Sequence, residues 1–186
     1  TGWSGELSYE LYLQDRKLGN KLFELVHDAA KEFNGRVIAP NTIRTIEGGL
    51  LSYGSDFGRA HNPFTIGFGR LVDLDQDADF IGKEALKAIK EKGLTEKLVG
   101  IELEGDPIRQ APENFWPIRN SDNKKIGRVS RAFFSPRLQK NIGLGIVDID
   151  YADELTKFFV STPHGDLESV VVSMPWFEAE KDTNLG

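Results

Sequence analysis

The chain has 186 residues, of which 39% are hydrophobic and 28% charged, a composition typical of a soluble globular protein with one large domain or two small ones. Its formal net charge of -6 argues against nucleic acid or an anionic membrane surface as the main partner, while still allowing a local basic pocket for an anionic ligand. The lack of cysteine excludes disulfides, thiolate metal sites and cysteine nucleophiles, and it fits a reducing, cytoplasmic location.

The first 40 residues predict a strand followed by a helix. Residues 7–13 alternate apolar and polar side chains, as in a strand with one apolar face, and Glu10 lies on the other face. Apolar residues recur at helical spacing over 18–33, and 36–40 form a short strand or lead-in. The first residues carry no basic n-region and no apolar h-region, so we expect no signal peptide among them, and no apolar run approaches the ~20 residues that span a bilayer. We therefore expect no membrane partner, and we expect the chain to be a fragment of a longer protein.

The next stretch predicts two helices separated by a loop and a strand. The first helix covers 41–54 and contains Gly48 and Gly49, each of which costs roughly 1 kcal/mol relative to alanine inside a helix. Such a pair indicates a close approach by another backbone or by a ligand. Residues 65–75 predict a strand, and 80–93 predict a short helix that ends at a glycine.

The pattern changes near residue 95. Six short β-type runs follow, separated by turn signals, as in a small barrel or sandwich. The runs are 97–105, 116–120, 125–134, 141–149, 157–162 and 168–174. We therefore expect an α+β chain with an α/β part over 1–94, an antiparallel β-barrel domain over 95–177, and a disordered tail over 178–186.

The residues by themselves contain no self-contained catalytic set. The three histidines, at positions 27, 61 and 164, lack partners at metal-ligand spacing, so we expect structural roles and no metal. The sequence has no P-loop, G-x-S-x-G elbow or dinucleotide-binding glycine motif. The exception is Trp3 with Glu10, because an indole and a carboxylate that accepts two hydrogen bonds can hold a flat heterocycle. A core tryptophan and a solvated edge glutamate are the alternative.

Several motifs, in order, resemble those of the glycine cleavage T-protein family, the folate-dependent aminomethyltransferases. "TGWSGELSYELYL" resembles the signature "GYTGEDGYEI", and "IRTIEGGLLSYGSDF" resembles the helix "LRLEAGLxLYGxDx". "DFIGKEAL" matches "DFIGREAL", and "KIGRVSRAFFSPRLQKNIGLGIVDI" resembles a "G-x-V-T-S-G" strand leading to "SP-x-L-x-x-NIALAYV". The resemblance covers about residues 1–173. Within the family, "PNTIRTIEGGLLSYGSDF", "NPFTIGF" and "LDQDADFIGKEALKAIKEKG" look most similar to the dimethylsulfoniopropionate demethylase branch.

The resemblance implies a partial folate-binding core followed by the family's barrel. It implies a tetrahydrofolate-dependent methyl or aminomethyl transferase whose N-terminal half, with the family's catalytic aspartate, precedes this chain, so that the fragment alone is inactive. Glu10 would hold the pterin ring and Trp3 would line its pocket. Tyr53 would either face the pocket or lie in the core. Arg44 and Arg131 are candidates, with Arg59, for the anionic glutamyl tail.

Two departures from the family pattern bear on this site. The family carries an arginine two residues before the helix glutamate, but here Thr45 has that position and Arg44 precedes it, about 100° around a helix. Arg131 replaces the glycine of "T-S-G". The expected partners are the missing half, a small-molecule donor (a lipoyl-borne aminomethyl group, a sulfonium or an aryl methyl ether) and a second copy in a homo-oligomer. Two alternatives are a folate-binding relative used in iron–sulfur assembly, whose cysteine motif is absent here, and an interaction module with no ligand.

Overall fold

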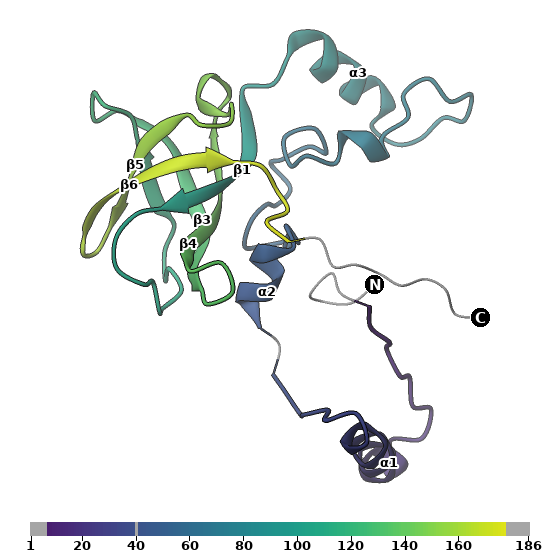
Figure 1. The fold of residues 1–186 in the computed structure, drawn as a ribbon. Coiled ribbons are helices and arrows are strands. Elements are labelled where there is room, and N and C mark those ends of the chain that lie inside the picture. The colour runs from purple at the N-terminus through teal and green to yellow at the C-terminus, as the bar shows by residue number, and fades with distance from the viewer. Residues whose placement is uncertain (1–6, 40, 178–186) are drawn as a thin grey trace.

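The computed structural model describes residues 7–39 and 41–177. Its six strands close into an antiparallel barrel in the order β1-β4-β3-β2-β5-β6, with α2 beside it and α1 set apart from it (Figure 1). In chain order the elements are η1 (Arg16–Leu18), α1 (Gly19–Lys31), α2 (Thr42–Glu47), η2 (Gly69–Leu71), α3 (Lys83–Lys92), β1 (Glu96–Leu103), β2 (Trp116–Arg119), β3 (Lys125–Ser135), β4 (Lys140–Asp148), η3 (Ile149–Tyr151), β5 (Lys157–Thr162) and β6 (Gly165–Val172).

The barrel confirms the expected β part of the chain. Each of the six predicted runs forms one strand, and closure pairs every strand on both sides, which removes the free edges of an open sheet. Apolar side chains from all six strands fill the interior. Those that are almost fully buried are Val99, Ile101, Leu103, Ile118, Ile126, Val129, Ala132, Val147, Phe158, Val160 and Val171.

Strand β4 is buried along both faces, because a second apolar cluster covers its outer side. There Ile142, Leu144 and Ile146 pack with Ile46 of α2. The positions between these side chains are glycines, because there is no room for a larger residue. A Cβ on Gly145 would lie 2.7 Å from Ile101 Cδ1 and 2.8 Å from a backbone oxygen. This second cluster fixes α2 against the barrel.

Helix α2 is shorter than predicted. It begins after Asn41, whose side chain accepts a hydrogen bond from Ile43 N at 2.9 Å, and it ends at Glu47. Gly48 is the C-cap and Gly49 has a φ of 63°, so the glycine pair terminates the helix. A Cβ on Gly49 would meet Pro175 only at 3.6 Å, which is ordinary contact. The left-handed backbone, rather than a close approach, therefore calls for glycine.

Two predicted strands are wrong. Residues 7–13 form no strand, because no other strand of the described chain lies alongside to pair with their backbone groups, and their alternating apolar side chains are exposed. Residues 65–75 contain η2 and turns instead. Asn62 Oδ1 accepts from Phe64 N at 3.0 Å and from Thr65 N at 3.1 Å, so local hydrogen bonds replace a ladder. The lead-in at 36–39 has no strand either.

The two remaining helices are confirmed, but only one of them ends as expected. Helix α3 stops at Gly93, which has a φ of 83°. Helix α1 ends at Lys31, before the predicted stop, and contains no buried residue. Its apolar side chains Phe23, Leu25 and Val26 are 55%, 61% and 46% exposed. The division near residue 95 stays a prediction, and the tail over 178–186 lies outside the described residues.

Candidate functional site

A bulge in β3 aims two consecutive side chains at one carboxylate. Val129 pairs with Gly145 and Arg131 with Leu144, so Ser130 is the extra residue in its strand. In a regular strand, neighbouring side chains point to opposite faces of the sheet. A bulge changes the direction of the side chains next to it, so two neighbours can point to the same side. Here Ser130 Oγ donates to Asp56 Oδ1 at 2.7 Å, and Arg131 Nε donates to the same oxygen at 2.9 Å.

Arg131 joins three parts of the chain through its guanidinium group. It makes a two-pronged ion pair with Asp56, completed by Nη2 to Oδ2 at 2.6 Å. Nη1 donates to Thr45 Oγ1 of α2 at 2.7 Å, and Nη2 donates to Leu50 O at 2.8 Å. Arg131 is 9% exposed and Asp56 is 1% exposed, so the pair is shielded from water. Arg131 is thus one of the connections between the barrel and residues 45–56.

A second buried carboxylate, Glu47, lies at the end of α2. Its Oε1 accepts a hydrogen bond from Ser135 Oγ at 2.6 Å. Its Oε2 has no hydrogen-bond partner in the described part of the chain, but Arg44 Nη1 and Arg137 Nε each lie 3.9 Å away. Two cationic side chains from different elements therefore converge on this acid.

Tyr53 is exposed rather than buried in the core. It lies in a tight turn in which Gly54 N donates to Phe57 O at 2.8 Å, and its ring meets Phe57 edge-on at 5.6 Å. With 66% of its surface exposed, the ring is available to a ligand. Arg131 binds Leu50 O before this turn and the Asp56 carboxylate within it.

Glu10 is exposed in the extended segment that precedes α1, apart from the barrel (Figure 1). The Tyr12 hydroxyl donates a hydrogen bond to Glu10 Oε2. That bond to a carboxylate, with a smaller contribution from desolvation, raises the pKa of the Tyr12 phenol above its ordinary value. Trp3 lies outside the described residues. The structure therefore leaves the Trp3–Glu10 pairing as a prediction.

The predicted arginines occupy different surroundings. Arg131 is buried and directs at least four N–H groups into the protein, whereas the Arg44 side chain is 39% exposed beside Glu47. The sequence reasoning missed the acids Glu47 and Asp56 as partners of these arginines. A signal for both was present, because the helix pattern "LRLEAGLxLYGxDx" carries an acid at each of the two positions. Nothing in the sequence marks Arg137, which comes from the turn after β3.

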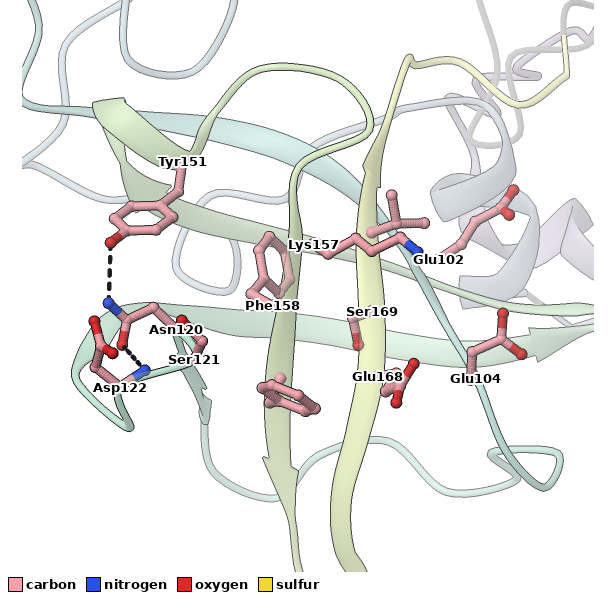
Figure 2. A pocket seen from close by; sticks show the side chains of 12 residues that line it. Glu102, Glu104, Asn120, Ser121, Asp122, Tyr151, Lys157, Phe158, Glu168 and Ser169 are labelled. Carbon is pink, nitrogen blue, oxygen red and sulfur yellow. Dashed lines mark hydrogen bonds between the residues drawn. The ribbon is translucent and has the colours of Figure 1, made fainter.

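A separate cavity of about 410 Å³ opens on the barrel beside β5 and β6. Figure 2 shows Phe158 and Ser169 on these strands, with Asn120 and Tyr151 joined by a hydrogen bond of 3.0 Å. Four acidic residues line it but only one basic residue, Lys157, which suits an anionic ligand poorly. None of the predicted site residues that the structure describes lines this cavity. In the described residues, no group of three or more His, Cys, Asp or Glu side chains could hold a metal ion, and no helix has the length and apolar character to cross a bilayer.

Comparison with known proteins assigns both parts of the chain to one type of protein. The glycine cleavage T-protein C-terminal barrel domain matches residues 96–178, and the GCVT N-terminal domain matches residues 1–76. A crystal structure of glycine cleavage system aminomethyltransferase T from Bartonella henselae has the same fold, with a TM-score of 0.74 at 20% identity, over 86% of this chain and 44% of that one. The architecture is thus the barrel and adjoining core region of a T-protein.

The chain belongs to the glycine cleavage T-protein family. An aminomethyltransferase from Caldanaerobacter subterraneus subsp. tengcongensis is 35% identical over 181 residues, which are 96% of this chain and 46% of the relative. A dimethylsulfoniopropionate demethylase from Ruegeria pomeroyi is 32% identical over 167 residues, which are 89% of this chain and 44% of the relative. The chain therefore spans about half the length of these curated relatives.

Proposed function

We propose that this chain is the C-terminal part of a tetrahydrofolate-dependent transferase that moves a methyl or aminomethyl group from an activated donor to tetrahydrofolate. The observation that carries this proposal is the similarity to aminomethyltransferases along 96% of the chain. In this proposal the enzyme is cytoplasmic and complete only with the preceding half, so we expect the chain alone to be inactive.

Different described residues would bind different parts of a folate. The exposed Glu10 carboxylate can accept hydrogen bonds from the amino group and ring N–H of the pterin, and the exposed Tyr53 ring can wall the pocket. Arg44 can approach the anionic tail, whereas the buried Arg131 is committed to Asp56. A folate nitrogen is itself the nucleophile, so these side chains mainly hold the ring in one orientation toward the donor.

Replacing Glu10 tests the folate assignment. In the longer protein, Glu10→Ala should weaken tetrahydrofolate binding by about 2–4 kcal/mol, or about 30- to 700-fold, because the pterin N–H groups lose a charged acceptor. Isothermal titration calorimetry measures the change. Glu154→Ala, at an exposed acid beyond η3, is the matched control and should bind like the parent. Equal affinity in the two variants would contradict the role of Glu10 in holding the pterin, and no binding by the parent would favour an interaction module without a folate site.

A sulfonium donor is the second candidate for the same reaction. The demethylase from Ruegeria pomeroyi is 32% identical over 89% of the chain, comparable with the aminomethyltransferases. Single-turnover assays of the longer protein with tetrahydrofolate and either a sulfonium or a lipoyl-borne aminomethyl donor distinguish the two. Methyl transfer only from the sulfonium would identify a demethylase.

The preceding half of the protein is the proposed partner of the apolar surface on residues 7–38. Leu7, Tyr9 and Leu11 are 56%, 72% and 62% exposed, and the apolar face of α1 is exposed as well. Patches of this kind mark surfaces that another part of a protein covers. The curated relatives have about twice the length of this chain. We propose that the additional half, which precedes this chain, covers the apolar surface. Self-association of the isolated chain through the same surface would give a homo-oligomer.

A charge placed on the apolar face of α1 tests this partner. Val26→Lys should lower the unfolding free energy of the longer protein by about 2 kcal/mol or more, because a lysine would be buried without a partner, but should change the isolated chain by less than about 0.5 kcal/mol. Glu24→Lys, on the polar face of α1, is the control and should be nearly neutral in both. Urea unfolding measures all four values. An equal effect of Val26→Lys in both proteins would contradict the proposed cover.

A further inference from the structure

We propose that Arg131 is a positioning residue for Tyr53 and not itself a ligand of folate. The proposal rests on the proposed function, in which Tyr53 walls the folate pocket. It changes the role that the sequence suggests for Arg131, and it follows from where the guanidinium group is held.

Arg131 binds the chain on both sides of Tyr53. It donates to Leu50 O at 2.8 Å, three residues before Tyr53, and to both oxygens of Asp56, at 2.9 and 2.6 Å, three residues after Tyr53. Asp56 in turn accepts from Ser52 N at 2.7 Å through Oδ2. The backbone on either side of Tyr53 is therefore tied to one guanidinium group, while the Tyr53 ring stays exposed.

The barrel supplies the rigid support for this grip. Arg131 lies in β3, the strand between β2 and β4 in the closed barrel, and the bulge at Ser130 adds a second donor to Asp56. Nη1 also donates to Thr45 Oγ1, so α2 is fixed by the same side chain. Side chains that orient a binding group are effective when they stand on a rigid element, and a barrel strand is one.

The kind of interaction favours positioning over simple stabilisation. A buried ion pair loses the hydration of two charges, and apolar side chains of similar volume often replace such a pair without loss of stability. A guanidinium group that donates to both oxygens of one carboxylate, however, fixes the relative orientation of the two side chains as well as their distance. Since Arg131 is 9% exposed and its N–H groups point at protein acceptors, the described contacts orient the turn rather than present a charge to a ligand.

The first test follows the surroundings of Tyr53 by fluorine NMR, in the chain of 186 residues. The protein is labelled with 3-fluorotyrosine, and the resonance that Tyr53→Phe removes is assigned to Tyr53. In the double variant Arg131→Met with Asp56→Leu, which exchanges the ion pair for apolar side chains and should keep the barrel folded, this resonance should shift and broaden. The Tyr151 resonance, in η3 on the barrel, is the internal control and should not move. An unchanged Tyr53 resonance in a folded double variant would overturn the proposal.

The second test is a cycle of tetrahydrofolate dissociation constants in the longer protein. Tyr53→Ala should weaken binding about tenfold in the parent but less than about twofold in the double variant, because residues coupled through one network do not act additively. Equal effects of Tyr53→Ala in both backgrounds would overturn the positioning role while leaving the folate site standing. Failure of the parent to bind tetrahydrofolate at all would overturn the proposed function, and the positioning role with it.

Discussion

Arg131→Met is expected to lower the unfolding free energy by about 3–5 kcal/mol, the effect of removing one partner from a buried ion pair. The carboxylate of Asp56, which is 1% exposed, would stay away from water, and Ser52 N and Ser130 Oγ would be its remaining donors in the described part of the chain. Leu50 O and Thr45 Oγ1 would lose their donors as well. Urea unfolding of the chain, followed by far-ultraviolet circular dichroism, measures the change as a lower midpoint.

A surface ion pair provides the matched control. Lys140 Nζ lies 2.7 Å from Glu102 Oε2, and the Lys140 side chain is 55% exposed. Lys140→Met should cost only about 0.2–1 kcal/mol, because water screens such pairs and solvates the remaining carboxylate. If Arg131→Met and Lys140→Met cost the same, the Arg131–Asp56 pair does not connect the barrel to residues 45–56 as the structure indicates.

Ile118→Ala is expected to cost about 2–5 kcal/mol, the range for large-to-small changes in a packed core. Ile118 is 0% exposed and belongs to the interior cluster of the barrel. It lies in β2, which pairs with β3 and β5 and so completes the ring of strands. Loss of its side chain leaves a cavity among branched side chains that the closed barrel cannot collapse to fill.

Ile81→Ala is the control for this prediction. Ile81 is fully exposed in the segment before α3, so its truncation should change the unfolding free energy by less than about 0.5 kcal/mol. Thermal unfolding by calorimetry compares the two variants with the parent. A similar small change for both would mean that β2 contributes little to the packed interior.

The strands of the barrel were predictable because each run carries its own signals. Apolar positions recur within each run, and turn residues separate the runs, so period and boundaries agree along the chain. In "NIGLGIVDI" the large apolar residues recur at every second position, as in a strand, and β4 confirms that strand. Helix α3 was equally predictable, because its helical pattern of apolar residues ends at a glycine that adopts a positive φ.

The errors have both distant and local causes. Residues 7–13 have the alternation of a strand, but a strand needs another backbone beside it, and no described residue supplies one. At 65–75 the side chain of Asn62 organises turns that a count of apolar residues does not reveal. The predicted helix over 41–54 was too long because its glycine pair acts as a terminator, with Gly49 in the left-handed region.

By itself the sequence determined the family, the six strands of the barrel and the main helices, because periodicity, turn residues and ordered motifs are local properties of the chain. Only the tertiary structure decided what Arg131 does. Its partners Asp56 and Thr45 lie 75 and 86 residues away along the chain, and a bulge in β3 aims its side chain at them. Long-range pairing of buried charges leaves no periodic trace in a sequence, since its free energy depends on burial and on geometry that form only when the barrel closes.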